Sequence, residues 1–250
     1  MKQTTAQAIL LPVATVALLG LNLSARATTL IVGNPSAGGN LYPFITYTGE
    51  YQLDYANSLF TTGPITITSI GFASAVGSIP GLTDNGTIDD TFNLSLAPTT
   101  ANPDSLSTTF VNNETTPLTQ VFTGTESATL LGTDTMDFII PITPFTFDPS
   151  TGDNLLMDIY ITNDSYTVNT QHKNGSFYSS PAFAMSATPS IGRVYTPTVG
   201  SPGVEADNEG LVTQFGFTPA ATPEPSPLVA LTAAFAMTLG LLLYKKKRAP

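Results

Sequence analysis

The only histidine of the chain, His172, is the first residue to consider for catalysis, because a serine–histidine–acid triad would have to use it. It stands between Gln171 and Lys173, beside an Asn174-Gly175 pair that is typical of a turn. Neither a Gly-x-Ser-x-Gly nucleophile motif nor a second residue at zinc-ligand spacing accompanies it. The sequence therefore favours an exposed loop histidine.

Paired carboxylates are the second kind of candidate, since a glycosidase places two of them on opposite sides of the bond that it cleaves. The nearest sets in the sequence are Asp89 with Asp90, Asp134 with Asp137, and Asp153 with Asp158. Neighbours in sequence do not by themselves face each other across a cleft. We interpret them as turn formers and solvated charges, and a carboxylate-based hydrolase stays open as an alternative.

The segment from Asp84 to Asp90 reads Asp-Asn-Gly-Thr-Ile-Asp-Asp and is rich in oxygen ligands of the kind that calcium prefers. Its spacing lacks the glutamate that ends an EF-hand loop, and it supplies fewer oxygens than calcium needs. The sequence therefore predicts no metal site and no cofactor, and calcium remains only as part of an alternative. Tyr166, Tyr178 and Tyr195 could stack on sugars, but aromatic residues more often fill a core.

Composition narrows the classes of function further. The chain has no cysteine, which excludes disulfides, thiolate metal sites and a cysteine nucleophile. Between residue 28 and the basic tail, only Lys173 and Arg193 oppose the 18 acidic residues, a formal charge of −16. A segment with this charge is repelled by nucleic acid and by anionic lipid.

The first 27 residues have the pattern of a signal peptide. Lys2 is a basic start, residues 9–23 form an apolar core, and Ala25-Arg26-Ala27 is a small-x-small cleavage site. Cleavage after Ala27 predicts a mature chain that begins at Thr28.

The last thirty residues have the pattern of a membrane anchor. A Pro-rich linker, residues 219–227, precedes 17 residues without a charge, residues 228–244, and a basic tail, residues 245–250. A helix of that length spans roughly 25 Å, near the lower limit for crossing a bilayer. The tail contains four consecutive basic residues, Lys245, Lys246, Lys247 and Arg248, and these should stay on the cytoplasmic side. The linker and everything before it are then outside.

The order of these parts resembles the PEP-CTERM sorting signal. Pro223, Glu224 and Pro225 form the signature, and an apolar helix and an arginine-ended basic cluster follow it at the end of the chain. The resemblance covers about 30 residues. It implies that an exosortase, a membrane-embedded cysteine transpeptidase, recognises and processes the tail.

Residues 28–218 lie between the two signals, and they predict an all-β fold. The segment is dense in Thr, Asn, Gly and Pro, and several stretches alternate apolar and polar residues. Residues 65–68 alternate, and then the phase shifts, which predicts a bulge near Ser69. Phe92, Leu94 and Leu96 predict one buried face, and alternation also marks residues 155–161 and 214–217. The only candidate helix is residues 50–60, where a strand is nearly as well supported.

Turn sequences separate these stretches, so we predict a single antiparallel β-sandwich or jelly-roll-like domain. Residues 51–67 and 145–159 are similar to segments that occur in PEP-CTERM cargo domains, which implies the same β-sandwich class. That similarity does not indicate a chemical activity.

The sequence thus favours an exported, non-enzymatic protein of the cell envelope or extracellular matrix, with a structural or adhesive role. Its predicted partners are an exosortase-type enzyme, the membrane through the C-terminal helix, and a polysaccharide in the alternative reading. That alternative is a carbohydrate-binding module, with or without calcium. Nucleic acid is not a predicted partner.

Overall fold

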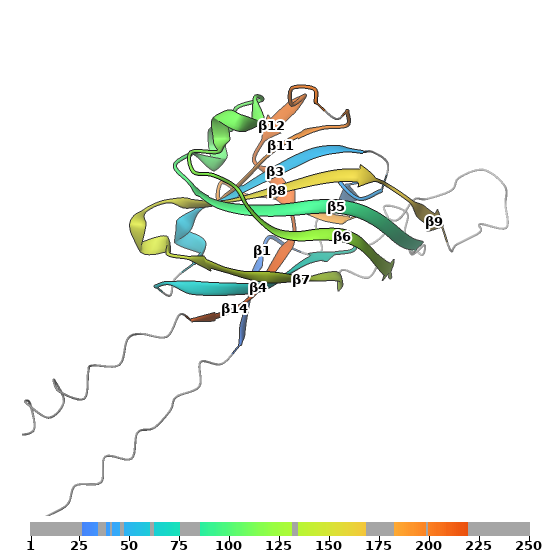
Figure 1. Ribbon diagram of the computed structural model, residues 1–250, viewed down its shortest axis with the longest axis horizontal. Helices are drawn as coiled ribbons and strands as arrows, with labels where there is room; N and C mark the ends of the chain where they lie inside the picture. Colours follow the sequence, from blue (N-terminus) through green and yellow to red (C-terminus); the bar gives the residue numbers. More distant parts are fainter. Residues whose placement is uncertain are drawn as a thin grey trace, which may run out of the picture.

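The protein is described by a computed structural model that covers residues 27–34, 39–40, 42–45, 48–60, 63–75, 86–131, 135–168, 183–198 and 200–219. Within these residues the regular structure consists of β-strands and short 3₁₀ turns. The strands form two main antiparallel layers, a large sheet and a small sheet, which Figure 1 shows one above the other. The expectation of an all-β, sandwich-like fold is confirmed.

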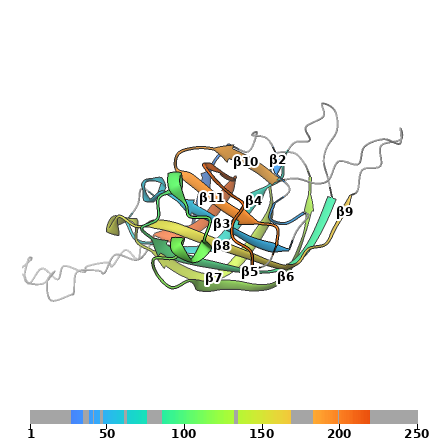
Figure 2. The same ribbon diagram turned by 90° about the horizontal axis from the view of Figure 1, so that it is seen from above.

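The large sheet has the order β12 (Glu205–Asp207), β11 (Ile191–Thr196), β3 (Gly49–Tyr55), β8 (Asn154–Asn163), β5 (Gly86–Thr99) and β6 (Thr119–Leu130), and β9 (Tyr166–Val168) also pairs with β5. The small sheet has the order β1 (Thr28–Val32), β14 (Thr213–Pro219), β4 (Ile65–Ala73) and β7 (Met136–Phe147). A short third sheet joins β13 (Glu209–Leu211), β10 (Phe183–Ala187) and β2 (Gly39–Asn40). Figure 2 shows β10 and β2 together at one side of the molecule.

The first and last strands of the described chain are neighbours. β1 and β14 pair antiparallel, with Thr28 opposite Phe217 and Val32 opposite Thr213. The two ends of the β-domain therefore leave it at the same edge of the small sheet (Figure 1).

The predicted bulge in β4 is confirmed. The pairing of β4 with β7 shifts register between Ile67 and Ser69, and the pairing with β14 shifts at the same level, between Gly216 and Phe217. The hydroxyl of Thr68 donates to the carbonyl of Gly216, at 3.2 Å. Because one residue is left out of the ladder, Ile67 and Ile70 both reach the core.

The candidate helix at residues 50–60 is wrong. This segment is strand β3 followed by the 3₁₀ turn η1 (Asn57–Leu59). Tyr51 and Tyr55, which a helix would place on one face, also share a face of a strand because they are four residues apart. The segment forms a strand because β3 pairs with both β8 and β11 and so lies inside the large sheet.

The core lies between the two main sheets and is rich in aromatic rings. Phe44 contacts Phe72, Phe92 and Phe138 at centroid distances of 5.0 to 5.3 Å. The predicted buried face of Phe92, Leu94 and Leu96 is confirmed. Each such ring removes a large apolar area from water, so these contacts are the main stabilising contribution to the fold.

One buried hydrogen bond joins the two main sheets and provides a first prediction. The Tyr55 hydroxyl lies 2.7 Å from Oγ1 of Thr213, and that Oγ1 in turn donates to the carbonyl of Leu211 at 2.9 Å. Tyr55 is therefore the donor. Replacing Tyr55 by Phe should lower the free energy of unfolding by about 1 kcal/mol, because the bond is lost while the ring packing stays.

Urea unfolding at constant pH measures this effect. Tyr160→Phe is the matched control, because Tyr160 lies half-buried on the other face of the same sheet and should change stability by less than about 0.5 kcal/mol. Equal effects of the two substitutions would contradict the assigned bond.

A long connection covers part of the outer face of the large sheet. Residues 100–118, which join β5 to β6, contain the 3₁₀ turns η2 (Pro103–Ser105) and η3 (Phe110–Asn113). We call residues 100–118 the cover segment. Its Leu106 and Phe110 pack on Val194 of β11, and Gly203 donates its amide hydrogen to the carbonyl of Thr108, at 2.7 Å.

A tight turn at residues 148–152 connects β7 to β8. The carboxylate of Asp148 accepts from the amide of Ser150 and caps the 3₁₀ turn η4 (Pro149–Thr151). Gly152 follows with φ of 90°, a left-handed conformation that glycine adopts without steric cost.

Candidate functional site

The predicted sorting residues lie outside the described residues. This applies to Pro223, Glu224, Pro225 and the basic cluster Lys245 to Arg248, and also to Ala25 of the cleavage motif. Ala27 is described and exposed, and it directly precedes β1. Within the described ranges no helix has the length and hydropathy to span a bilayer.

Several candidate residues also lie outside the described residues: His172 and Asp134 for catalysis, Asp84 and Asn85 for calcium, and Tyr178 for stacking on sugars. Of the pairs that can be followed, Asp89 and Asp90 point to opposite faces of β5, Asp89 exposed and Asp90 fully buried. Asp153 lies at the turn before β8, while Asp158 is buried within β8. Neither sequence pair forms a facing pair of carboxyls.

Tyr195 is not the exposed sugar platform that the sequence allowed. Its ring is half-buried, and its centroid lies 4.5 Å from the ring centroid of Tyr42 and 5.8 Å from that of Tyr51. The guanidinium of Arg193 lies 5.2 Å from the same ring and makes charged hydrogen bonds to Asp207 at 2.8 Å. Tyr166, in contrast, is 38% exposed.

The structure instead brings together acids that are distant in sequence. Glu50, Gln52 and Asp54 alternate along β3 on the outer face of the large sheet, and Asp158 of β8 lies opposite Gln52 on the same face. We call these four residues the covered polar row. The cover segment lies over them, so Gln52 and Asp54 are fully buried and Asp158 is 8% exposed.

Amide side chains connect the covered polar row to the cover segment. The Gln52 Oε1 accepts from Nδ2 of Asn113 at 3.1 Å, and the Gln52 Nε2 donates to Glu114 at 3.3 Å. Asn113 also accepts from the amide of Ser107 at 2.8 Å. At the other end of the segment, Nδ2 of Asn154 donates to the carbonyl of Ala101 at 2.8 Å. These bonds fix the cover segment in place over the acids.

Asp54 is the most isolated of these acids. Neither of its carboxyl oxygens has a hydrogen-bond partner among the described residues. Burial raises the pKa of Asp54 to about 8, and the nearby Asn154 amide opposes this only partly. The carboxyl is therefore neutral over most of the range below pH 8.

Asp158 and Glu50 form a close carboxyl pair. Burial and the charge of Glu50 raise the pKa of Asp158 to about 8, and burial also raises the pKa of Glu50. Like charges on neighbouring strands disfavour each other's ionisation, which adds to the effect of burial.

Asp90 and Asp164 form a second such pair, where β8 turns into β9. The Asp90 Oδ1 accepts from the amide of Ser165 at 3.1 Å, while its Oδ2 has no partner among the described residues. Burial, and next the charge of Asp164, raise the pKa of Asp90 to about 8. Within the described part of the chain, no three acids or histidines are arranged to hold a metal ion.

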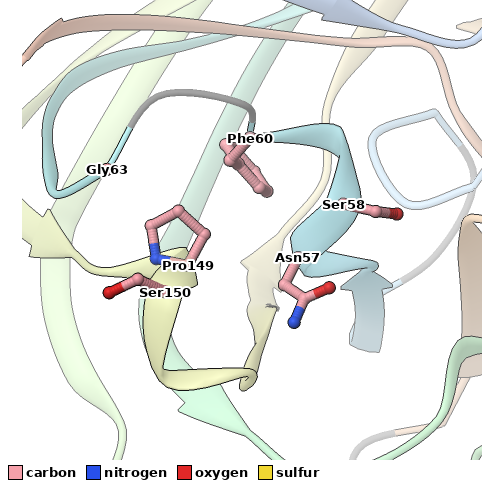
Figure 3. Close-up of a pocket in the computed structure, with 6 residues that line it drawn as sticks. All are labelled: Asn57, Ser58, Phe60, Gly63, Pro149 and Ser150. Carbon is pink, nitrogen blue, oxygen red and sulfur yellow. The ribbon is translucent and has the colours of Figure 1, made fainter.

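Two hollows of the described surface are lined by uncharged residues. The first has a volume of about 300 Å³ and lies between η1 and η4. Figure 3 shows Asn57 and Phe60 on one side of it and Pro149 and Ser150 on the other.

The second hollow, of about 320 Å³, lies between β6 and β7. We call it the β6–β7 groove, and its lining residues are Gln120, Val121, Phe122, Thr123, Pro141 and Thr143. Three of these side chains carry hydrogen-bonding groups, and none carries a charge. The groove therefore offers polar groups but no charge to a ligand.

Sequence reasoning missed the covered polar row. The alternation of Glu50, Gln52 and Asp54 along a strand was visible and is typical of a solvated face. Nothing in the sequence showed that residues 100–118 cover that face. The missed signal was the length of this connection, which is long for a link between adjacent strands.

Comparisons of the chain with family models, with curated proteins and with solved structures found no match.

Proposed function

We propose that the chain is an exported protein of the cell envelope or extracellular matrix that a PEP-CTERM signal sorts, with a structural or adhesive, non-enzymatic role. In this proposal the signal peptide is removed after Ala27. The apolar segment, residues 228–244, then holds the protein in the membrane until an exosortase-type enzyme processes the tail. The product stays in the envelope or leaves the cell.

The pairing of β1 with β14 is the observation that supports this proposal best. β1 begins at Thr28, directly after the predicted cleavage site, and β14 ends at Pro219, four residues before Pro223. Both proposed cuts therefore fall outside the strands, and removal of both signals leaves the β-sandwich whole. The acidic charge of the exported part is compatible with a soluble product that does not adhere to anionic lipid.

Replacing Pro223, Glu224 and Pro225 together by Ala should leave the full-length protein in the membrane of its native host. In this proposal, the three residues are what the enzyme recognises, because prolines favour an extended backbone that an enzyme's binding cleft can hold. Intact-mass measurement of protein from those cells tests this. The expected wild-type mass lacks residues 228–250.

Ala substitution of Pro202, Ser201 and Thr198 is a matched control, because these residues lie in a loop before β12 and far from the tail in sequence. This control should be processed like the wild type. A wild-type mature species that still ends at Pro250 would show that the segment serves only as an anchor.

A second candidate function is carbohydrate binding, and the uncharged lining of the β6–β7 groove favours it. Neutral glycans are bound through hydroxyl and amide groups and through apolar ring faces. A glycan array with and without a chelator tests this candidate. Binding that survives the chelator supports a calcium-independent module, and an array without any signal removes the candidate.

The carboxylate-based hydrolase has weaker support. Glu50 and Asp158, whose charges interact, belong to the covered polar row, and Asp158 is only 8% exposed. A substrate would have to displace the cover segment to reach Asp158.

A further inference from the structure

We propose that the β6–β7 groove binds one sugar unit of a neutral polysaccharide, with the ring surfaces of Phe122 and Pro141 as its apolar contacts. This inference rests on the carbohydrate-binding candidate above and assigns that function to a site. It does not depend on how the tail is processed.

The groove lies where the two main sheets meet without pairing. β6 is the last strand of the large sheet and β7 is the last strand of the small sheet, and they are neighbours in space (Figure 1). An edge strand leaves alternate backbone N–H and C=O groups unpaired. The walls of the groove therefore offer backbone donors and acceptors in addition to the side chains.

The side chains in the groove have the chemistry of a sugar subsite. Phe122 is half-buried and packs on Phe92 at a centroid distance of 4.8 Å, so its ring is fixed by the core. Pro141 is exposed on the opposite wall. Gln120, Thr123 and Thr143 are exposed and supply an amide and two hydroxyls. A sugar ring has apolar C–H faces and hydroxyl groups at its rim, which fits this combination.

Two of the polar groups are held in position before a ligand binds. The Asn93 Oδ1 accepts from Nε2 of Gln120 at 3.1 Å and from Oγ1 of Thr123 at 2.6 Å. The amide and hydroxyl therefore lose less freedom on binding than isolated surface side chains would. The volume of about 320 Å³ is at the small end of ligand sites, which fits one unit of a longer chain.

The absence of charged residues from the groove favours a neutral polymer. The lining contains no acid or base, although the exported segment carries 18 acidic residues and two basic ones. A groove without a cation has no group to neutralise an anionic polysaccharide, and the surrounding negative charge repels such a polymer. A groove without a carboxylate lacks the charged ligands of a calcium site, so binding should not need calcium.

Prolines make an extended peptide the less favoured ligand. A peptide that adds to a sheet edge pairs with successive backbone groups of that edge. β7 contains Pro141 and Pro144, which have no amide hydrogen to donate. The β7 wall therefore cannot complete the ladder that a bound strand needs.

The experiment measures affinity of the full-length chain in mild detergent for dextran, mannan, a mixed-linkage β-glucan and alginate, by affinity electrophoresis and calorimetry. The double variant Gln120→Ala with Thr143→Ala removes a polar group from each wall. Both side chains are exposed, so the variant should fold like the wild type. Thr125→Ala is the matched control, because Thr125 is exposed on the same strand but lies outside the groove.

We expect at least one neutral polymer to bind, with or without a chelator. Its affinity should fall at least tenfold in the double variant and remain unchanged in Thr125→Ala. Binding that the double variant retains would overturn this site while leaving carbohydrate binding as a function. Preference for alginate, or binding of an extended peptide in place of the glycans, would also overturn it. If no polymer binds, both the site and the carbohydrate candidate fail, whereas the sorting proposal stands on the tail experiment alone.

Discussion

The free energy of unfolding of this protein should fall as the pH is raised from about 4 to about 8. Buried carboxyls cause this dependence, because Asp54, Asp90 and Asp158 each have a folded-state pKa of about 8. In an unfolded chain, aspartate has a pKa near 3.9. Most proteins lose stability toward acid, so the expected trend is opposite to the usual one.

The sign follows from which state binds more protons. Below about pH 4 these carboxyls are protonated in both states, and they add no pH dependence. Between about pH 4 and pH 8 the folded state keeps protons that the unfolded state has lost, so each rise in pH favours unfolding. Above the folded-state pKa both states are ionised, and the dependence ends.

The magnitude is large relative to the stability of a domain. One such group changes the unfolding free energy by at most about 1.4 kcal/mol per pH unit. A whole domain is stable by only about 5 to 15 kcal/mol, so even one such group titrating over several pH units changes a sizeable share of the total. A local opening that hydrates Asp54 and Asp158 costs less than global unfolding. We therefore expect the cover segment, which lies over both, to open first.

The variants Asp54→Asn and Asp158→Asn test this explanation, since an amide is neutral at every pH used. Each should reduce the slope of unfolding free energy against pH, by up to about 1.4 kcal/mol per unit. Asp89→Asn is the control, because Asp89 is exposed on the outer face of the same sheet and gives the same change in net charge. Urea unfolding followed by tyrosine fluorescence between pH 4 and pH 9 measures all four proteins. A wild-type stability that is level or rising over this range would contradict the assignment.

Local patterns predicted β4, β5, β8 and β14 because the cause of each pattern is local. The alternation in β5, β8 and β14 follows from a face that packs on the opposite sheet. The phase shift at Ser69 could be read as a bulge because one extra residue moves every later side chain to the other face. At residues 50–60 the same reasoning left helix and strand open, since a spacing of four residues fits both periods.

The burial of the acids in the covered polar row could not be predicted from local patterns. Glu50 and Asp158 are 108 positions apart and meet only because β3 pairs with β8. Their burial depends on the cover segment, whose position is set by Phe110, Leu106 and the amide of Asn113. The β6–β7 groove likewise depends on two sheet edges coming together. These are consequences of topology, which no short window of sequence contains.

A second large loss of stability is expected from Gly192→Ala, which adds a single methyl group to β11. A Cβ atom added at Gly192 would lie 2.0 Å from the carbonyl oxygen of Pro103 and 2.8 Å or less from the carbonyl carbon and Cα of the same residue. All three are backbone atoms of η2, so no side-chain rotation relieves the contact. Gly192→Ala should force the cover segment away from the sheet and cost about 3 kcal/mol or more.

Gly63→Ala is the matched control, because a Cβ at Gly63 meets no atom within 4 Å. Its effect on the urea midpoint should be small. A stability loss in Gly192→Ala no larger than in Gly63→Ala would show that η2 is not packed against β11 as described.

Gly192→Ala should also change the pH dependence of stability that arises from Asp54. Gly192 lies opposite Asp54 in the pairing of β11 with β3, so displacement of η2 at this point admits water to the Asp54 carboxyl. Hydration removes the cause of the raised pKa, and the share of the pH slope that belongs to Asp54 should disappear with it. Gly192→Ala combined with Asp54→Asn should then show the same pH slope as Gly192→Ala alone. If Asp54→Asn still reduced the slope by its full amount in that background, burial of Asp54 would have to come from the sheet itself and not from the cover segment.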